Sequence, residues 1–541
     1  MNRRLIEKAD ALISKERGTV FKEPGGRINI CLVYPNTYHV GMSNLGFQGI
    51  YAILNERDDI VCERAFLPND EDIDEYSRTD TELFSIESKK PLNRFDIVAF
   101  SVSFENDYPN IIRILQLSKI PCKALERNIS HPLIMFGGVC AFFNPEPIAD
   151  FFDICFIGEA EEMLDEFIEM NKASATRDAL LRNSSRIEGV YIPKFYKIFY
   201  GNGIIRREKI YAEVPDRIKK RHIKDISSHR FRHAIITSET EFSETYLIEA
   251  MRGCPWKCRF CVAGHIYNPP RQKSLSVIRE EVREALKRTG RVGLIGPSMS
   301  DYVHASDVLS IEGVDFSITS LRASQKSARI VSLMKGRKSI SIAPETGTER
   351  LRKVVDKNIT DEEIIEASRL ILSESIENLR LYFMIGLPTE KDEDINGIVS
   401  LVKKIRDASK KGNITITLST FIPKPFTPFQ WHPMERMDVV KERLRKIKKS
   451  LLPAKGVRVF HDVPKYAYMQ GLFSMGDRRL SGAIEKISQT QNWRKACTDS
   501  GIDPDFYTMR KRDLSEDSPW DFIDAGIPKE KLWEEYQKAV S

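Results

Sequence analysis

The stretch RGCPWKCRFC, residues 252–261, places three cysteines in one short segment. Cys254, Cys258 and Cys261 are separated first by three residues and then by two, so a single loop can present three thiolates to one inorganic centre. No further cysteine follows until Cys497. A cubane iron-sulfur cluster held by only three cysteines keeps one iron open to a small molecule, which suits a reactive site. The loop therefore predicts a [4Fe-4S] cluster.

Zinc is the alternative metal for this loop. A zinc site would normally recruit a fourth Cys or His, and the only near candidate is His265, four residues after Cys261. The asymmetric spacing of three and two residues is not usual for zinc. The spacing favours the cluster and leaves zinc as the competing interpretation.

Length and composition indicate a multidomain globular protein. The chain has 541 residues, of which 41% are hydrophobic and 30% charged, and two or three domains are expected. The N-terminus lacks the apolar core of a signal peptide, and no run approaches the length of a membrane span, so we expect a cytoplasmic protein without a membrane partner. The net charge of +6 argues neither for nor against nucleic acid. The six scattered cysteines are expected to be buried rather than paired in disulfides.

The N-terminal part alternates short apolar runs with helical segments. INICLVYP, FDIVAFSVS, PLIMFGG and DICFIGEAEE are the expected strands, and this alternation predicts a doubly wound parallel sheet over residues 28–171. Residues 1–27 are expected to form a helical lead and 172–240 a linker with short strands. Ligands of such sheets bind outside the carboxyl ends of the strands.

The alternation resumes over residues 241–430 with six repeats, which predicts an incomplete six-unit (βα) barrel. Its expected strands are TYLIEAM, RVGLIG, DFSITS, SISIAPE, LRLYFMIG and ITITLSTFIP. Active sites of βα barrels lie at the carboxyl ends of the strands, and the cysteine loop follows the first strand directly. Residues 431–541 are expected to form a mixed α+β extension, in which Trp431, Asp477, Arg478, Trp520 and Asp521 either line a substrate site or pack.

A CxxxCxxC loop after the first strand of such a barrel resembles the radical S-adenosylmethionine (SAM) superfamily. Phe260, just before the third cysteine, matches the aromatic residue usual there, and the later strands end in IGPSMSD, APETGTERL and MIGLPTE. The resemblance implies that SAM is bound by residues at these strand ends: Phe260, Gly296, Ser320, Arg322, Glu345 and Gly386. The metal ligands that it implies are the three cysteines of the loop.

The resemblance also implies the chemistry. The amino and carboxylate groups of SAM chelate the open iron, one electron passes from the reduced cluster to the sulfonium, and homolysis gives a 5′-deoxyadenosyl radical. An electron donor such as flavodoxin or ferredoxin is then an expected partner.

The N-terminal part resembles the cobalamin-binding domain that is often fused to this barrel. The turns YPNTYHVGMSNLG, GGVCAFFNPEP and IGEAEE occur in that domain's order, which implies that Gly137, Gly138 and Gly158 admit the corrin by close backbone approach. One departure is clear: the DxHxxG motif that supplies a cobalt-binding histidine is absent, because His39 in NTYHVGM has neither the Asp nor the Gly at the required positions.

With cobalamin, the expected reaction is methyl transfer to an unactivated carbon of a small-molecule, peptide or RNA substrate. One SAM molecule then donates the methyl group and a second generates the radical. Methylthiolation of RNA or protein is the alternative that the sixth-strand segment STFIPKPFTPFQW favours, although the second cysteine trio of such enzymes has no counterpart here. A non-catalytic iron-sulfur sensor module is the other alternative.

Overall fold

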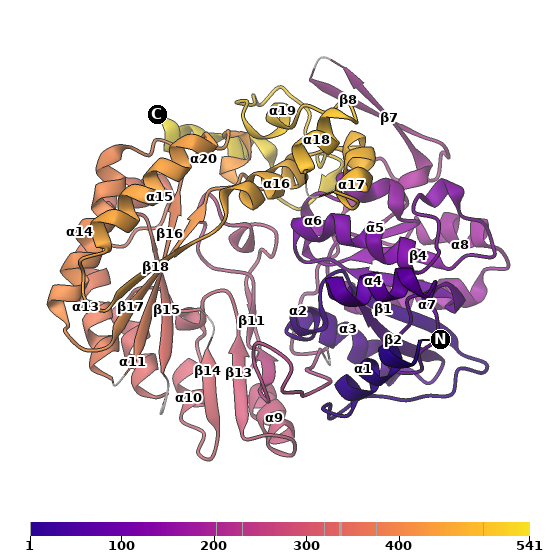
Figure 1. The fold of residues 1–541 in the computed structure, drawn as a ribbon, viewed down its shortest axis with the longest axis horizontal. Helices are drawn as coiled ribbons and strands as arrows, with labels where there is room; N and C mark the ends of the chain where they lie inside the picture. Colours follow the sequence, from indigo (N-terminus) through magenta and orange to yellow (C-terminus); the bar gives the residue numbers. More distant parts are fainter. Residues whose placement is uncertain are drawn as a thin grey trace. The chain divides into compact units, whose positions relative to one another are not determined.

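The computed structural model describes residues 2–201, 203–229, 231–318, 320–334, 338–374, 376–490 and 492–541 (Figure 1). The chain divides into two compact units. Unit 1 comprises Met1–Thr245, Phe473–Pro504 and Ser515–Gly526, and unit 2 comprises Tyr246–Leu472, Asp505–Leu514 and Ile527–Ser541. Each unit therefore takes part of the C-terminal hundred residues into its own core.

Unit 1 is built on a six-stranded sheet in the order β2-β1-β3-β4-β5-β6. Neighbouring strands are parallel from β2 to β5, and β6 is antiparallel to β5. The order 2-1-3-4-5 is that of a doubly wound fold, as the sequence predicts. The strands are β1 (Ile28–Tyr34), β2 (Ile60–Phe66), β3 (Ile97–Ser101), β4 (Leu133–Gly137), β5 (Ile154–Phe156) and β6 (Val190–Tyr191).

The helices of unit 1 alternate with these strands. They are α1 (Arg3–Ile13), α2 (Tyr38–Met42), α3 (Leu45–Glu56), α4 (Asp70–Arg78), α5 (Tyr108–Leu117), α6 (Val139–Phe143), α7 (Ala160–Ala173), α8 (Arg177–Ser184), α17 (Ser481–Ile487) and α18 (Trp493–Thr498). The hairpin of β7 (Tyr196–Gly201) and β8 (Ile204–Lys209) and the short pair β9 (Ile218–Lys219) and β19 (Ile523–Asp524) complete the unit.

Strand β2 is the element that the sequence pattern did not reveal. Its segment IVCERAF contains two adjacent charged residues, Glu63 and Arg64, yet every residue of the strand is buried. Arg64 is 0% exposed because Glu16 and Glu87 pair with its guanidinium at 2.7 and 2.6 Å. The partners come from distant positions, so the apolar pattern alone could not identify the strand.

In its described residues, unit 2 has seven parallel strands in chain order. One sheet has the order β10-β13-β14 and the other β15-β16-β17-β18, and an isolated bridge between Leu321 and Ile342 links them. The first six are the predicted barrel strands, and β18 from the C-terminal extension adds a seventh. They are β10 (Tyr246–Glu249), β13 (Arg291–Ile295), β14 (Asp315–Ile318), β15 (Ser339–Glu345), β16 (Asn378–Ile385), β17 (Asn413–Thr420) and β18 (Val457–His461).

The helices of unit 2 flank these strands, as Figure 1 shows for α11, α13, α14 and α15. The helices are α9 (Leu275–Leu286), α10 (Ala305–Leu309), α11 (Gln325–Ser332), α12 (Glu349–Val354), α13 (Asp361–Ser373), α14 (Asp392–Ala408), α15 (Met437–Leu451) and α20 (Lys529–Val540), with α16 (Pro464–Met475) and α19 (Pro504–Thr508) where the chain passes between the units. Among the described residues, no helix combines the length and the apolar character needed to cross a bilayer.

Candidate functional site

The cysteine loop connects two short antiparallel strands, β11 (Met251–Arg252) and β12 (Arg271–Gln272). Gly253 begins the loop with φ +83°, and a Cβ there would meet the Tyr267 carbonyl oxygen at 2.3 Å. Only glycine fits this combination of conformation and close approach. Within the loop, the Cys254 amide donates to the Ala263 carbonyl and the Cys261 amide to the Cys258 carbonyl, at 3.2 and 3.0 Å.

Arg259, between the second and third cysteines, ties the loop to three other segments. Its amide donates to the Val355 carbonyl at 3.0 Å, and its carbonyl accepts from the Phe429 amide at 3.2 Å. Its guanidinium pairs with Glu535 of the C-terminal helix α20 at 2.9 Å. The position of the loop therefore depends on residues nearly 280 positions away in sequence.

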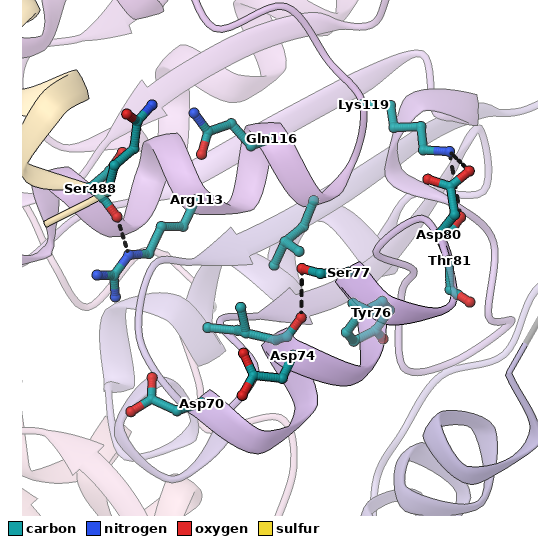
Figure 2. A pocket seen from close by; sticks show the side chains of 13 residues that line it. Asp70, Asp74, Tyr76, Ser77, Asp80, Thr81, Arg113, Gln116, Lys119 and Ser488 are labelled. Carbon is teal, nitrogen blue, oxygen red and sulfur yellow. Dashed lines mark hydrogen bonds and ion pairs between the residues drawn. The ribbon is translucent and has the colours of Figure 1, made fainter.

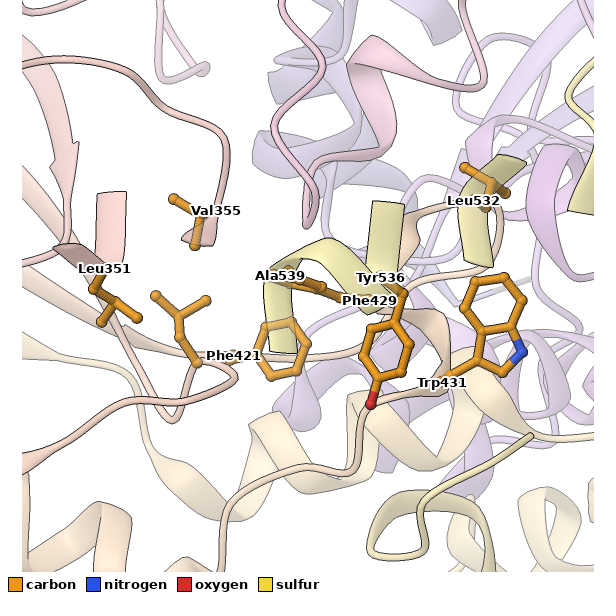
Figure 3. Close-up of a cluster of buried hydrophobic side chains, with 9 residues drawn as sticks. Leu351, Val355, Phe421, Phe429, Trp431, Leu532, Tyr536 and Ala539 are labelled. Atoms are coloured by element: carbon orange, nitrogen blue, oxygen red, sulfur yellow. The ribbon is translucent and has the colours of Figure 1, made fainter. Parts of the chain in front are cut away.

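An apolar cluster supports the same contacts (Figure 3). It joins residues of α12 and α20 and of the segments that follow α12, β16 and β17: Leu351, Val355, Leu387, Phe421, Phe429, Trp431, Leu532, Tyr536 and Ala539. Phe260 of the cysteine loop packs against it. The cluster thus connects the core of unit 2 to the loop that carries the cysteines.

A pocket of 220 Å³ lies at the carboxyl ends of the barrel strands. Its lining includes Cys254, Cys258 and Cys261, and also Phe260, Ser320, Arg322 and Glu345. These seven sequence-predicted residues come from three separate segments, so the fold brings them together. The lining also contains residues that the sequence did not single out: Trp256, Pro297, Ser298, Leu321, Ser341, Ile342, Ala343, Lys357 and Tyr382.

Polar contacts order one wall of this pocket. The guanidinium carbon of Arg322 lies 3.7 Å from the centre of the Trp256 ring. The Trp256 indole Nε1 donates to Asp301 at 2.7 Å, and the Ser298 hydroxyl donates to the same carboxylate at 2.6 Å. Trp256 lies between the first two cysteines, so this network couples the cysteine loop to the ends of β13 and β14.

Glu345 and Lys357 form a second polar part of the lining. Their carboxylate and ammonium groups are 2.8 Å apart, and both side chains are largely buried. Glu345 has φ +68°, and the register of β15 against β16 shifts between Ile342 and Glu345. A positive φ is strained for a residue with a Cβ and is characteristic of functional positions. No local motif marks Lys357, because its partner lies twelve residues away.

The donor chemistry of the pocket fits an iron-sulfur cluster. Three thiols line one small cavity, and burial raises the pKa of each of them, that of Cys258 to about 11. Soft thiolates are the ligands that iron-sulfur clusters use, and metal binding holds them deprotonated. Among the described residues, no three His, Cys, Asp or Glu side chains converge on a single-ion site. A cubane cluster does not require its ligands to meet at one ion, because each thiolate binds a separate iron.

His265, the fourth ligand that zinc would need, does not line the pocket. It is 6% exposed, and its Nε2 lies 3.3 Å from the Cys258 carbonyl oxygen. The side chain therefore contacts the main chain of the loop.

Gly296 and Gly386 lie at the ends of β13 and β16, and neither belongs to the lining of the pocket. A Cβ at Gly296 would meet Met251 Cγ at 2.4 Å, so packing already requires a glycine there. Gly386 has φ +85°, and its amide donates to Glu390 at 2.8 Å. Their role toward SAM stays a prediction.

The three glycines predicted to contact cobalamin, Gly137, Gly138 and Gly158, lie at the carboxyl ends of β4 and β5. Gly138 has φ +100° and would place a Cβ 2.5 Å from the Val102 carbonyl oxygen, and Gly158 has φ +121° and would place one 2.4 Å from that of Arg221. Both approach the chain's own backbone. Gly137 differs, because its Cβ would have only an ordinary contact of 3.8 Å with Phe156.

The topological switch point of unit 1 lies between the carboxyl ends of β1 and β3, where ligands of doubly wound sheets bind. Asn36 follows β1, and its side-chain amide donates to Oδ1 of Asp107, which follows β3, at 2.7 Å. Asp107 is 3% exposed, and its Oδ2 makes no hydrogen bond within the described structure. A buried polar atom without a partner fits a site that is completed by a ligand.

Burial raises the pKa of Asp107 from 3.8 to about 7. Between these values the unfolded chain loses the proton while the folded chain retains it, so stability falls as pH rises from about 4 to about 7. We expect Asp107→Asn, which cannot ionise, to reduce the difference in the free energy of unfolding between pH 4 and pH 8 by up to about 4 kcal/mol. Urea unfolding at both pH values measures this, with Asp74→Asn on the exposed side of α4 as control. An unchanged pH dependence would contradict the assignment.

Another pocket, of 530 Å³, belongs to unit 1 and lies between α4, α5 and the turn after α17 (Figure 2). Two of its basic groups have partners within the lining: Lys119 pairs with Asp80 at 2.8 Å, and Arg113 donates to the Ser488 carbonyl at 2.8 Å. Its lining includes none of the predicted site residues.

Of the tail residues that the sequence highlighted, Asp521 is half-buried, and the other four are buried or paired. Trp431 and Trp520 are each 1% exposed. Arg478 pairs with the buried carboxylate of Glu146 at 3.1 Å, and Asp477 accepts from Arg479 at 2.7 Å. For the tryptophans, burial favours the packing interpretation over the substrate-site one.

Parts of both units match known protein families. Residues 46–193 match the family of radical SAM proteins, N-terminal, and residues 248–402 match the radical SAM superfamily. The chain is 29% identical over 465 residues to an uncharacterized protein of Methanocaldococcus jannaschii, which covers 84% of this chain and 90% of that protein. It is 26% identical over 178 residues to tRNA-2-methylthio-N(6)-dimethylallyladenosine synthase of Pelotomaculum thermopropionicum, covering 29% of this chain and 40% of that enzyme.

Two solved structures share the fold. The radical SAM methyltransferase TsrM of Kitasatospora setae, solved with cobalamin and a [4Fe-4S] cluster, matches with a TM-score of 0.51 at 12% identity, covering 87% of this chain and 100% of that one. The cobalamin-dependent SAM radical enzyme OxsB, solved with aqua-cobalamin and SAM, matches with a TM-score of 0.51 at 14% identity, covering 95% and 80%. At these identities the likeness concerns the fold.

Proposed function

We propose that this chain, which belongs to the radical SAM superfamily, catalyses cobalamin-assisted methyl transfer to an unactivated carbon. The observation that carries the proposal is the pocket in which three cysteines meet Ser320, Arg322 and Glu345 at the mouth of a partial barrel. As a radical SAM enzyme it uses a [4Fe-4S] cluster and SAM and needs a reductant. When bound, the cluster supplies the electron that cleaves SAM, and cobalamin supplies a carrier for the methyl group.

In this proposal Cys254, Cys258 and Cys261 hold the cluster. Arg322, stacked on Trp256, provides a fixed guanidinium for the carboxylate of SAM, and Glu345 accepts hydrogen bonds from its ribose or amino group. Phe260 closes the pocket against water from the side of the apolar cluster. Gly296 and Gly386 shape the strand ends beside it.

Unit 1 would hold cobalamin at the carboxyl ends of its parallel strands. Its strand order, the unpartnered Oδ2 of Asp107 at the switch point and the open side of Gly137 fit such a ligand. His39 is an exposed residue 3.8 Å from Glu241, and it does not belong to a cobalt-binding motif. Cobalamin would therefore bind here without a histidine from the DxHxxG motif.

The test of the proposed function uses full-length protein reconstituted anaerobically with iron, sulfide and hydroxocobalamin. With reductant and SAM, methyl transfer through cobalamin predicts both S-adenosylhomocysteine and 5′-deoxyadenosine, because one SAM donates the methyl group and another yields the radical. Omission of cobalamin should abolish S-adenosylhomocysteine formation. Formation of 5′-deoxyadenosine alone, unaffected by cobalamin, would refute methyl transfer and leave another radical reaction.

Glu345→Gln tests the assignment of the SAM site. The substitution removes the negative charge that faces Lys357 while it keeps the size of the side chain. Because a neutral amide is a weaker acceptor for the ribose or amino group of SAM, we expect SAM affinity to fall about tenfold, with iron content unchanged. Calorimetric titration of the reconstituted protein measures the affinity. Glu374→Gln, at an exposed position after α13, is the control. Equal affinities for wild type and Glu345→Gln would remove Glu345 from the SAM site.

Methylthiolation of tRNA has weaker support. The match to the methylthio synthase covers 29% of this chain, whereas the fold likeness to the two cobalamin-binding enzymes covers 87% and 95%. A mass increase of one methyl group, rather than a methylthio group, in the modified product distinguishes the two reactions.

A further inference from the structure

Strands β15 to β18 present one face to the cysteine pocket. In β16, Leu379, Leu381 and Phe383 are buried, whereas Arg380 and Tyr382 on the other face are exposed. β17 has the same alternation. Because Tyr382 and Ser341 line the cysteine pocket, the open face is the one that continues from it.

Two arginines share one level of this open face. The parallel registers align Ser341 with Arg380, Arg380 with Thr415, and Thr415 with Arg458. Arg380 and Arg458 are both exposed, and neither side chain makes a hydrogen bond or an ion pair within the described residues. They are two strands apart, about 10 Å, so their long side chains can reach one group placed between them.

The charge of this face is positive. Within the four strands the only carboxylate on it is Glu345, which Lys357 neutralises at 2.8 Å. Two guanidinium groups without acidic partners favour an anion, and their planar forks match the oxygens of a phosphate or a carboxylate. The Thr415 hydroxyl lies between them and donates to Asn378 at 2.8 Å, which orders the floor of the site.

Two aromatic side chains lie at the next level. Tyr382 is aligned with Thr417, and Thr417 with Phe460. Tyr382 is 37% and Phe460 57% exposed, so both rings offer apolar surface that a planar ligand can contact. This level is two residues, about 7 Å, closer to the carboxyl ends of the strands than the arginines.

We propose that this face binds the substrate of the proposed methyl transfer through an oxyanion held by Arg380 and Arg458 and a planar ring in contact with Tyr382 and Phe460. That the ligand of this face is a substrate rests on the proposed function. The ligand class is an aromatic or heteroaromatic phosphate or carboxylate, for which a nucleotide has suitable chemistry.

The order of the two levels also predicts which part of the substrate reacts. Tyr382 lines the cysteine pocket, and the two arginines do not. An oxyanion at the arginine level would therefore leave the ring nearer to the cysteines. We expect modification on the ring or on a carbon attached to it, and not beside the oxyanion.

The experiment is equilibrium binding by calorimetry to the full-length, reconstituted protein saturated with SAM. The probes are two matched pairs: uridine 5′-monophosphate with uridine, and indole-3-carboxylate with indole. At least one anion should bind at least tenfold more tightly than its neutral partner, and the pair that does so identifies phosphate or carboxylate as the preferred group. Equal affinity within both pairs would overturn the proposal.

Substitutions assign the binding to the face. Arg380→Ala and Arg458→Ala should each weaken binding of the anion about tenfold and leave the neutral partner unchanged. Tyr382→Ala should weaken both members of the pair. Arg445→Ala, at an exposed arginine of α15, should change nothing, and a loss there as large as at Arg380 would refute the site. Because binding requires no turnover, this result is independent of whether S-adenosylhomocysteine is formed.

Discussion

Replacement of Cys258 by alanine is expected to eliminate the iron-sulfur cluster, with iron falling from about four atoms per chain to near zero. Cys258 is the central residue of the trio, 9% exposed, in a loop held by main-chain hydrogen bonds to Ala263 and Val355. Two remaining thiolates cannot retain a cubane that lacks a fourth protein ligand. Iron and sulfide analysis after anaerobic reconstitution measures the loss, and 5′-deoxyadenosine formation should disappear with it.

Cys497→Ala is the matched control. Cys497 is fully buried in α18 of unit 1 and lies in the other unit from the pocket, so its replacement should leave iron content and SAM cleavage intact. Circular dichroism should show that both variants are folded. If the wild-type protein contains one zinc ion instead, and His265→Ala removes it, the cluster assignment is refuted.

Replacement of Trp431 by alanine is expected to lower the free energy of unfolding by about 3–5 kcal/mol, because a large buried indole is lost and a cavity remains. Trp431 is 1% exposed, and its ring contacts Trp533 and Tyr536 of α20 at centroid distances of 5.1 and 6.0 Å. Figure 3 shows it among the residues that support the cysteine loop. Thermal unfolding of the reconstituted protein measures the effect.

The same variant should also lose iron faster in the presence of a chelator. Phe429, two positions before Trp431, donates its amide to Arg259 between the second and third cysteines. Tyr466→Ala, at an aromatic residue that is 53% exposed, is the control and should change neither stability nor iron release. If Trp431→Ala destabilised the protein but left the rate of iron release unchanged, the apolar cluster would not support the cysteine loop.

Much of the fold could be predicted from local patterns. The six barrel strands were identified because alternating or continuous apolar runs end in Gly and polar turns, and the four recognised strands of unit 1 follow the same rule. The pattern failed at β2, whose Glu63 and Arg64 resemble a surface segment. Their burial is stabilised by partners such as Ser85, Glu16 and Glu87, and no local rule anticipates such distant partners.

Some residues of the candidate site could also be identified from the sequence, and others only from the structure. Cys254, Cys258, Cys261 and Phe260 belong to one loop, so the sequence identified them as a unit. Lys357, Trp256 and Tyr382 became visible only in the pocket. Glycines were the least informative residues, because the close approach that requires Gly138 and Gly158 is to Val102 and Arg221 of the same chain.

By itself, the sequence determined the metal chemistry and the succession of strands, because thiolate spacing and apolar periodicity are local properties. Only the tertiary structure decided that α20 supports the cysteine loop, that β18 joins the barrel sheet, and that Arg380 and Arg458 lie level on one open face. These relations depend on strand register and long-range packing, which join residues from distant parts of the chain.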